Sequence, residues 1–112
     1  MLAAARQMYR QFEARRTRRV QVFIPATLVI AGKACPVHML DLSTDGTLLH
    51  VEDDLPIGEK VWLLRNGLDV FARIAWGRGT RYGLAFEKPL RGEQYDGLLQ
   101  AKDNRLMIAG MA

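Results

Sequence analysis

The feature that most constrains the fold of this chain is a series of short apolar segments that alternate in polarity and end in turn residues. Alternation over about four to eight residues is typical of a half-buried β-strand. Asn66–Gly67 lies between two of these segments and is the strongest hairpin signal in the sequence. The six segments expected to form strands are residues 19–32, 33–43, 46–53, 60–65, 68–77 and 81–88.

The spacing of these segments predicts a mainly β fold. Strands that recur about every 8–12 residues, with turns between them, indicate an antiparallel barrel or sandwich. A six-stranded barrel has no open strand edge, which suits strands as apolar as these. Pro25 lies inside the first segment and cannot donate a backbone hydrogen bond, so we expect a strand edge or a bulge there.

Two helices are expected outside the strands. Residues 3–13 are good helix formers and precede the first strand. In residues 90–107, Leu98 and Lys102 lie at helical spacing, which predicts a short helix packed on the barrel. The expected organisation is a helical segment over 1–12, a barrel domain with its C-terminal helix over 13–102, and a tail over 103–112.

Length and composition limit the possible classes of protein. The 112 residues are 49% hydrophobic, enough for one domain with a buried core. A single cysteine, Cys35, excludes an internal disulfide, and His38 and His50 lack metal-ligand spacing, so we expect no metal site. No apolar stretch approaches the roughly 18 residues of a membrane span, and the first residues do not resemble a signal peptide. We therefore expect a cytoplasmic protein.

The positive charge of the chain is concentrated at one place. The formal net charge is +4, yet residues 1–19 carry six arginines against Glu13, and the rest of the chain carries ten basic and eleven acidic side chains. A nucleic-acid-binding protein usually spreads its cations over a whole face. Here four arginines crowd together just before the first strand, namely Arg15, Arg16, Arg18 and Arg19.

Two motifs give this cluster a context. Arg15 and Arg19 form R-x-x-x-R before the first strand, and Asp41, Ser43 and Gly46 form D-x-S-x-x-G between the second and third strands. In type, order and strand context the pair resembles the PilZ domain family of bacterial receptors for cyclic di-GMP. The resemblance implies a six-stranded PilZ-type β-barrel, no catalytic residues, and cyclic di-GMP as ligand in place of a cofactor.

A later stretch is also similar to the family, through Trp76, Gly83 and Phe86, so the resemblance covers roughly residues 13–88. One departure affects stoichiometry. Many family members carry an extra arginine just before R-x-x-x-R, where this chain has Ala14. The sequence therefore leaves open whether one dinucleotide or an intercalated pair binds.

The residue types fit a guanine dinucleotide. The guanidinium groups of Arg15, Arg16 and Arg19 can fork onto phosphates, bond the guanine edge or stack on the base. The carboxylate of Asp41 can accept from the N1–H and N2–H₂ groups of guanine, which adenine lacks. These four residues are the principal candidates for contacts with the ligand.

The sequence supports three further candidate ligand contacts less strongly. Ser43 can donate to the ligand or tie down its own turn. Gly46 permits either a positive φ or a close approach of the ligand. Trp76 offers a stacking platform, but its place in the apolar alternation fits a core position equally well.

Several functions remain open at this point. The leading interpretation is a non-enzymatic receptor that relays cyclic di-GMP binding to a protein partner in motility, adhesion or exopolysaccharide control. A second is a PilZ-like interaction module that binds no nucleotide. Taken alone, the arginine cluster would be interpreted as a solvated run or a nucleic-acid arm, and the second motif is what favours a ligand site. The near-neutral body and sparse aromatic residues of the chain disfavour nucleic-acid binding. An enzyme is disfavoured because no nucleophile–base pair or phosphate-cradling loop is evident.

Overall fold

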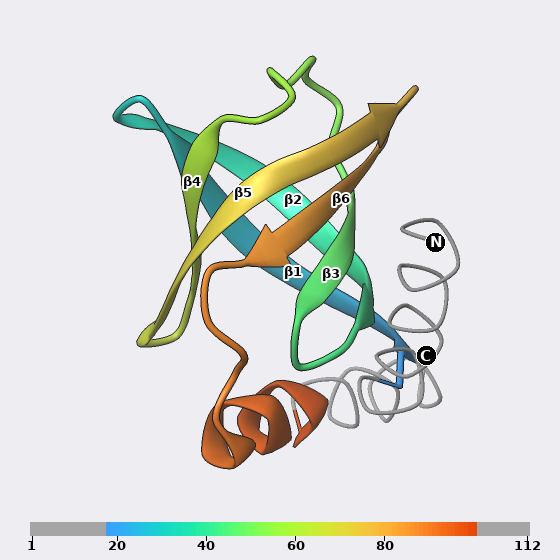
Figure 1. The fold of residues 1–112 in the computed structure, drawn as a ribbon, viewed down its shortest axis with the longest axis vertical. Helices are drawn as coiled ribbons and strands as arrows, with labels where there is room; N and C mark the ends of the chain where they lie inside the picture. The colour runs from blue at the N-terminus through green and yellow to red at the C-terminus, as the bar shows by residue number, and fades with distance from the viewer. Residues whose placement is uncertain (1–17, 101–112) are drawn as a thin grey trace, which may run out of the picture.

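The computed structural model describes residues 18–100, which form a closed antiparallel barrel followed by one helix (Figure 1). Neighbouring strands around the barrel follow the order β1-β2-β3-β6-β5-β4. The predicted mainly β, six-stranded barrel is confirmed; the N-terminal helix expected over 3–13 and the tail over 103–112 lie outside the described residues. The strands are β1 Val20–Ile30, β2 Lys33–Leu42, β3 Gly46–His50, β4 Lys60–Arg65, β5 Leu68–Arg78 and β6 Arg81–Phe86.

Tight turns join the strand pairs that the sequence marked. Asn66 and Gly67 both have positive φ, 44° and 85°, as a type I′ hairpin requires, and they connect β4 to β5. Ala31 and Gly32 connect β1 to β2 with φ of 50° and 79°. The β4–β5 hairpin therefore uses the residues expected from the sequence, and both turns fix the register of the strands that follow.

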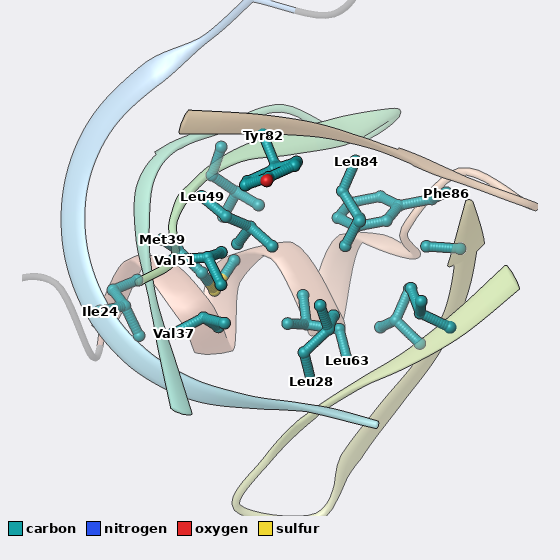
Figure 2. Close-up of a cluster of buried hydrophobic side chains, with 14 of the residues drawn as sticks. Ile24, Leu28, Val37, Met39, Leu49, Val51, Leu63, Tyr82, Leu84 and Phe86 are labelled. Atoms are coloured by element: carbon teal, nitrogen blue, oxygen red, sulfur yellow. The ribbon is translucent and has the colours of Figure 1, made fainter. Parts of the chain in front are cut away.

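The inner faces of the strands fill the barrel with apolar side chains. Figure 2 shows these side chains converging on the interior from opposite walls. The polar end of one inward residue is satisfied, because the hydroxyl of buried Tyr82 accepts a hydrogen bond from the backbone N–H of Leu55 at 3.0 Å. The most deeply buried large residues include Ile24, Leu28, Met39, Leu42, Leu49, Leu63 and Ile74.

Three register shifts interrupt the alternation of inward and outward side chains. They lie between Gln21 and Ile24 in β1, between Met39 and Asp41 in β2, and around Ala75 in β5. Each inserts one extra residue into its strand, so a side chain beyond the bulge faces the other way. These bulges decide which residues reach the outer surface near the candidate site.

Pro25 lies directly after the β1 bulge, where the strand has a partner on one side only. It pairs with His38 of β2, whereas β1 pairs with β4 only over Thr27–Val29. The carbonyl of Pro25 accepts a hydrogen bond from Arg65 Nη1 at 2.6 Å. The local edge expected at this proline is therefore present, and a side chain of β4 bridges it.

The helix of residues 92–100 lies at the end of the barrel that carries the β2–β3 and β4–β5 turns (Figure 1). Leu98 and Leu90 belong to the hydrophobic core, which confirms the predicted packing of this helix on the barrel. The helix begins with half of a capping box, in which Gln94 Oε1 accepts from the backbone N–H of Arg91 at 2.8 Å. Core burial and this cap offset the low helix propensity of the two glycines in the helix.

We expect Leu98→Ala to lower the free energy of unfolding by about 2–3 kcal/mol, because it deletes a side chain that is 4% exposed within the core. Urea unfolding of the full chain measures this change. The exposed neighbour Gln100 supplies the control, since Gln100→Ala should change stability by less than about 0.5 kcal/mol. Equal effects of the two substitutions would mean that the helix does not pack on the barrel in solution.

Candidate functional site

A row of four residues crosses the outer surface of four neighbouring strands. Asp41 of β2 lies opposite Leu48 of β3, Leu48 lies opposite Gly83 of β6, and Gly83 lies opposite Trp76 of β5. All four line one open hollow of about 420 Å³, together with Arg19, Thr47, Arg78 and Arg81. The hollow therefore gathers the second arginine of R-x-x-x-R, the aspartate of D-x-S-x-x-G and the late tryptophan.

Bulges turn two of these side chains outward. Met39 is buried, so simple alternation would place Asp41 on the inner face as well, but the extra residue Leu40 reverses this. The extra residue Ala75 has the same effect between buried Ile74 and Trp76. The core position that the apolar alternation allowed for Trp76 is therefore not the one it occupies: Val70, Ala72 and Ile74 are buried, and Trp76 is 47% exposed.

Asp41 is held in place by two parts of the chain. Its Oδ1 accepts the backbone N–H of Leu48 at 2.9 Å and the Nη1 of Arg19 at 2.7 Å, while its backbone carbonyl accepts the Thr47 hydroxyl at 2.5 Å. Among residues 18–100, none forms a hydrogen bond with the second carboxylate oxygen, Oδ2. The side chain is 20% exposed, so this oxygen is a fixed acceptor at the hollow.

Arg19 links the two motifs directly. Its guanidinium forms the ion pair with Asp41, although its side chain remains 57% exposed. An ion pair so open to water contributes about 0–1 kcal/mol to stability. Of the arginines predicted to contact a ligand, Arg19 is the one placed at the hollow; Arg15 and Arg16 lie outside the described residues.

Ser43 is committed to its own turn. The residue is 2% exposed, and its hydroxyl oxygen accepts the backbone N–H groups of Asp45 and Gly46, each at 3.2 Å. The backbone N–H of Ser43 in turn donates to the carbonyl of Gly46 at 2.9 Å. The side chain of Ser43 is therefore buried within its own loop between β2 and β3, and it does not line the hollow.

Gly46 is required for a reason other than its φ angle. Among residues 18–100 the glycines with positive φ are at positions 32, 58, 67 and 79, so the positive φ considered for Gly46 is not what the fold uses. A Cβ on Gly46 would instead overlap the backbone carbonyl oxygen of Leu84 on β6. Gly46 thus allows β3 and β6 to approach closely, and it does not line the hollow.

Trp76 rests on a second glycine. A Cβ on Gly83 would overlap the indole of Trp76 at Nε1, Cε2 and Cδ1, so the missing side chain leaves space for the ring against β6. The opposite strand position therefore supports the indole while nearly half of the residue stays exposed. An aromatic ring held in this way at a hollow can stack on a planar base.

Two arginines of the site, Arg78 and Arg81, were not singled out from the sequence. They flank the β5–β6 turn, are exposed and line the hollow beside Trp76. Their spacing from Trp76 and Gly83 is the signal that could have found them, since residues two apart on a strand share a face. The hollow thus contains three guanidinium groups and one carboxylate.

The one cysteine is not part of this arrangement. Cys35 is buried, and its thiol donates to Asp53 Oδ2 at 3.3 Å. Burial raises the pKa of the Cys35 thiol, and the hydrogen bond and charge of Asp53 raise it further. The thiol is therefore protonated near neutral pH, which makes it a weak nucleophile.

Comparison of the sequence with protein-family models gives a match that covers the barrel and both motifs. The model of the PilZ domain family matches residues 13–101, a range that includes every described strand and both motifs. The chain belongs to the PilZ domain family. PilZ domains are generally non-enzymatic modules that bind cyclic di-GMP. A comparison with curated proteins found no match. Within residues 18–100, no helix is both long enough and apolar enough to cross a membrane.

We expect Gly46→Ala to destabilise the barrel by about 1–3 kcal/mol, because the added methyl group meets a backbone carbonyl that cannot rotate away. Gly83→Ala should cost less than about 1 kcal/mol, since its obstacle is a side chain that can turn. Denaturant unfolding measures both changes. Equal losses would contradict this distinction between the two glycines.

The same Gly83→Ala change should displace the indole of Trp76. In a Trp62→Phe background Trp76 is the one remaining tryptophan of the chain, so its fluorescence reports on that ring alone. We expect a shift of the emission maximum on Gly83→Ala and no shift on Gly97→Ala, where nothing beyond the adjacent residues and the backbone of the helix itself lies within 4 Å of the added methyl group. An unchanged spectrum in the Gly83 variant would show that the ring does not rest on this glycine.

Proposed function

We propose that this PilZ domain is a receptor that binds cyclic di-GMP in the hollow formed by Asp41, Leu48, Gly83 and Trp76. The observation that carries the proposal is the meeting of Arg19, Asp41 and Trp76 at one hollow, from three distant parts of the sequence. Family membership supports the ligand, since PilZ domains generally bind cyclic di-GMP. The hollow supplies groups for each part of that molecule.

Asp41 would read the guanine base. Its Oδ1 accepts hydrogen bonds from Leu48 and Arg19, and its Oδ2 forms no hydrogen bond with the described part of the chain. Guanine presents N1–H and N2–H₂ as adjacent donors, whereas adenine presents an acceptor at N1. A fixed carboxylate therefore favours guanine, because it can accept hydrogen bonds from both of these donors, whereas adenine offers it no donor at N1.

The arginines would bind the phosphates and the exposed base edges. Arg19 is already at the hollow, and Arg15 lies four residues earlier, within about 14 Å of chain. Arg15 and Arg16 can therefore reach a ligand that contacts Arg19. Each guanidinium that meets a phosphate forms charge-assisted hydrogen bonds, which are stronger than neutral ones.

The same contacts would carry the signal. Arg19 immediately precedes β1, so a ligand that bridges the arginines to Asp41 connects the preceding segment to the barrel surface. A protein partner that binds this ligand-dependent surface would transmit the signal. In a PilZ domain of this kind, such partners would act in motility, adhesion or exopolysaccharide control, in a bacterial cytoplasm.

A calorimetric titration of the full chain tests the proposal. We expect cyclic di-GMP to bind at least about tenfold more tightly than cyclic di-AMP, because each donor or acceptor left unpaired costs about 1–3 kcal/mol. Asp41→Asn should reduce this preference, since the side-chain oxygen can stay on the Leu48 N–H and the amide group then replaces Oδ2 with a donor. Binding of neither dinucleotide by the folded protein would support an interaction module that does not use the nucleotide.

Arg19→Ala should weaken cyclic di-GMP binding by about tenfold while leaving the melting temperature nearly unchanged. The reason is that its ion pair with Asp41 is exposed and contributes little to the fold. The weakened affinity should also depend less on salt, because one ionic contact has been removed. Arg91→Ala is the control, since Arg91 forms an exposed ion pair with Glu93 and does not line the hollow. A variant that unfolds would instead assign Arg19 a structural role.

A further inference from the structure

A row of apolar residues crosses the outer surface of the barrel on the side away from the hollow. Its members are paired in successive strands, namely Ala34 of β2, Val29 of β1, Trp62 of β4 and Phe71 of β5. In the closed ring, β1 and β4 lie across from β3 and β6, the strands at the middle of the hollow (Figure 1). We call these four residues the apolar row, and none of them lines the hollow.

The centre of the apolar row is aromatic and open to water. The rings of Trp62 and Phe71 lie 4.8 Å apart between centroids and are tilted by 48°. Trp62 is 45% exposed, and a second open hollow, of about 460 Å³, borders both rings. Exposed aromatic side chains that are held together in this way are typical of the centre of a protein interface, where tryptophan and phenylalanine are enriched.

Opposite charges lie on the two sides of this row. Asp69, Phe71 and Arg73 are every second residue of β5, so all three face outward, with the ring between the carboxylate and the guanidinium. About 13 Å of strand separates Asp69 from Arg73. Within residues 18–100 neither of these two side chains forms an ion pair. An exposed aromatic row is therefore flanked by two exposed and unpaired charges of opposite sign.

We propose that the apolar row is the interface of a two-fold dimer, in which the row of a second copy of this chain covers it. A two-fold axis that runs along the row places the two copies of Trp62 against each other and reverses the direction of β5 between them. Arg73 of each copy then faces Asp69 of the other. The aromatic rings form the centre of the interface and the ion pairs form its rim, which is the usual arrangement.

The order of charges along β5 favours a second copy over an unrelated partner. An interface of two-fold symmetry requires a surface that is complementary to itself. The order negative, aromatic, positive has this property when two strands run antiparallel about Phe71. Lys60, which lies opposite Arg73, would extend over half-buried Leu64 of the other copy, where its methylene groups can pack. The dimer leaves both hollows open, because the row and the hollow share no residue.

Analytical ultracentrifugation of the full chain, at concentrations up to about 1 mM, tests the proposal. We expect the wild type to dimerise, and Asp69→Lys and Arg73→Glu each to weaken the dimer by at least about tenfold, because each change sets like charges against one another. The double variant Asp69→Lys, Arg73→Glu restores opposite charges and should dimerise as the wild type does. Asp54→Lys is the control, since it makes the same change of charge at an exposed loop position outside the row and should leave the dimer unchanged.

Mixing the two single variants tests the symmetry of the pairing. At these two positions the Asp69→Lys chain is entirely positive and the Arg73→Glu chain entirely negative, so the mixture should associate more strongly than either variant alone. Trp62→Ala should also weaken the dimer, because it removes the centre of the interface without disturbing the core.

Three results would overturn the proposal: a wild-type chain that stays monomeric over the whole concentration range, a dimer that survives both charge reversals and Trp62→Ala, or a mixture that associates no better than its components. None of these measurements involves cyclic di-GMP, so their failure would leave the proposed receptor function intact. Failure of the dinucleotide to bind would likewise leave the dimer intact.

Discussion

Closure of six short strands into one barrel is the constraint on which the site depends. In a closed antiparallel ring, the register of each strand pair fixes which side chains face the core and which face water. Two one-residue bulges, at Leu40 and Ala75, reverse that assignment for Asp41 and Trp76. The outer surface thereby gains an acceptor and an aromatic ring on one row. The candidate site is thus produced by the strand register itself and not by a long loop.

Two glycines complete this surface by different means. Gly46 lets the backbones of β3 and β6 meet, so the loop after Asp41 is drawn in against the barrel and Ser43 is buried under it. Gly83 leaves room for the indole of Trp76 on β6. The D-x-S-x-x-G motif therefore has a division of roles in this chain: Asp41 faces the hollow, whereas Ser43 and Gly46 shape the turn that positions it.

The sequence predicted the parts of this molecule that depend on local pattern. Alternation and turn residues located the strands, Asn66–Gly67 marked a hairpin, and the spacing of Leu98 predicted a packed helix. The orientation of Trp76 could not be predicted, because a bulge is a property of the pairing between β5 and β6 and leaves no mark in the alternation of β5 alone. The structural role of Gly46 could not be predicted either, because its contact with Leu84 joins residues 38 positions apart. Arg78 and Arg81 were missed because two arginines in a turn resemble ordinary solvated charges.

The ion pair between Arg19 and Asp41 connects the two motifs before any ligand arrives. It is exposed, so it stabilises the fold little, and its partners can exchange one contact for another at low cost. A phosphate that attracts Arg19 competes with Asp41 for the guanidinium, while a guanine that donates to Oδ2 places hydrogen-bond donors beside the same carboxylate. In the proposed receptor, each motif would therefore respond to what the other binds. Because Arg19 directly precedes β1, a ligand that holds its guanidinium would also restrain the chain that leads into the barrel.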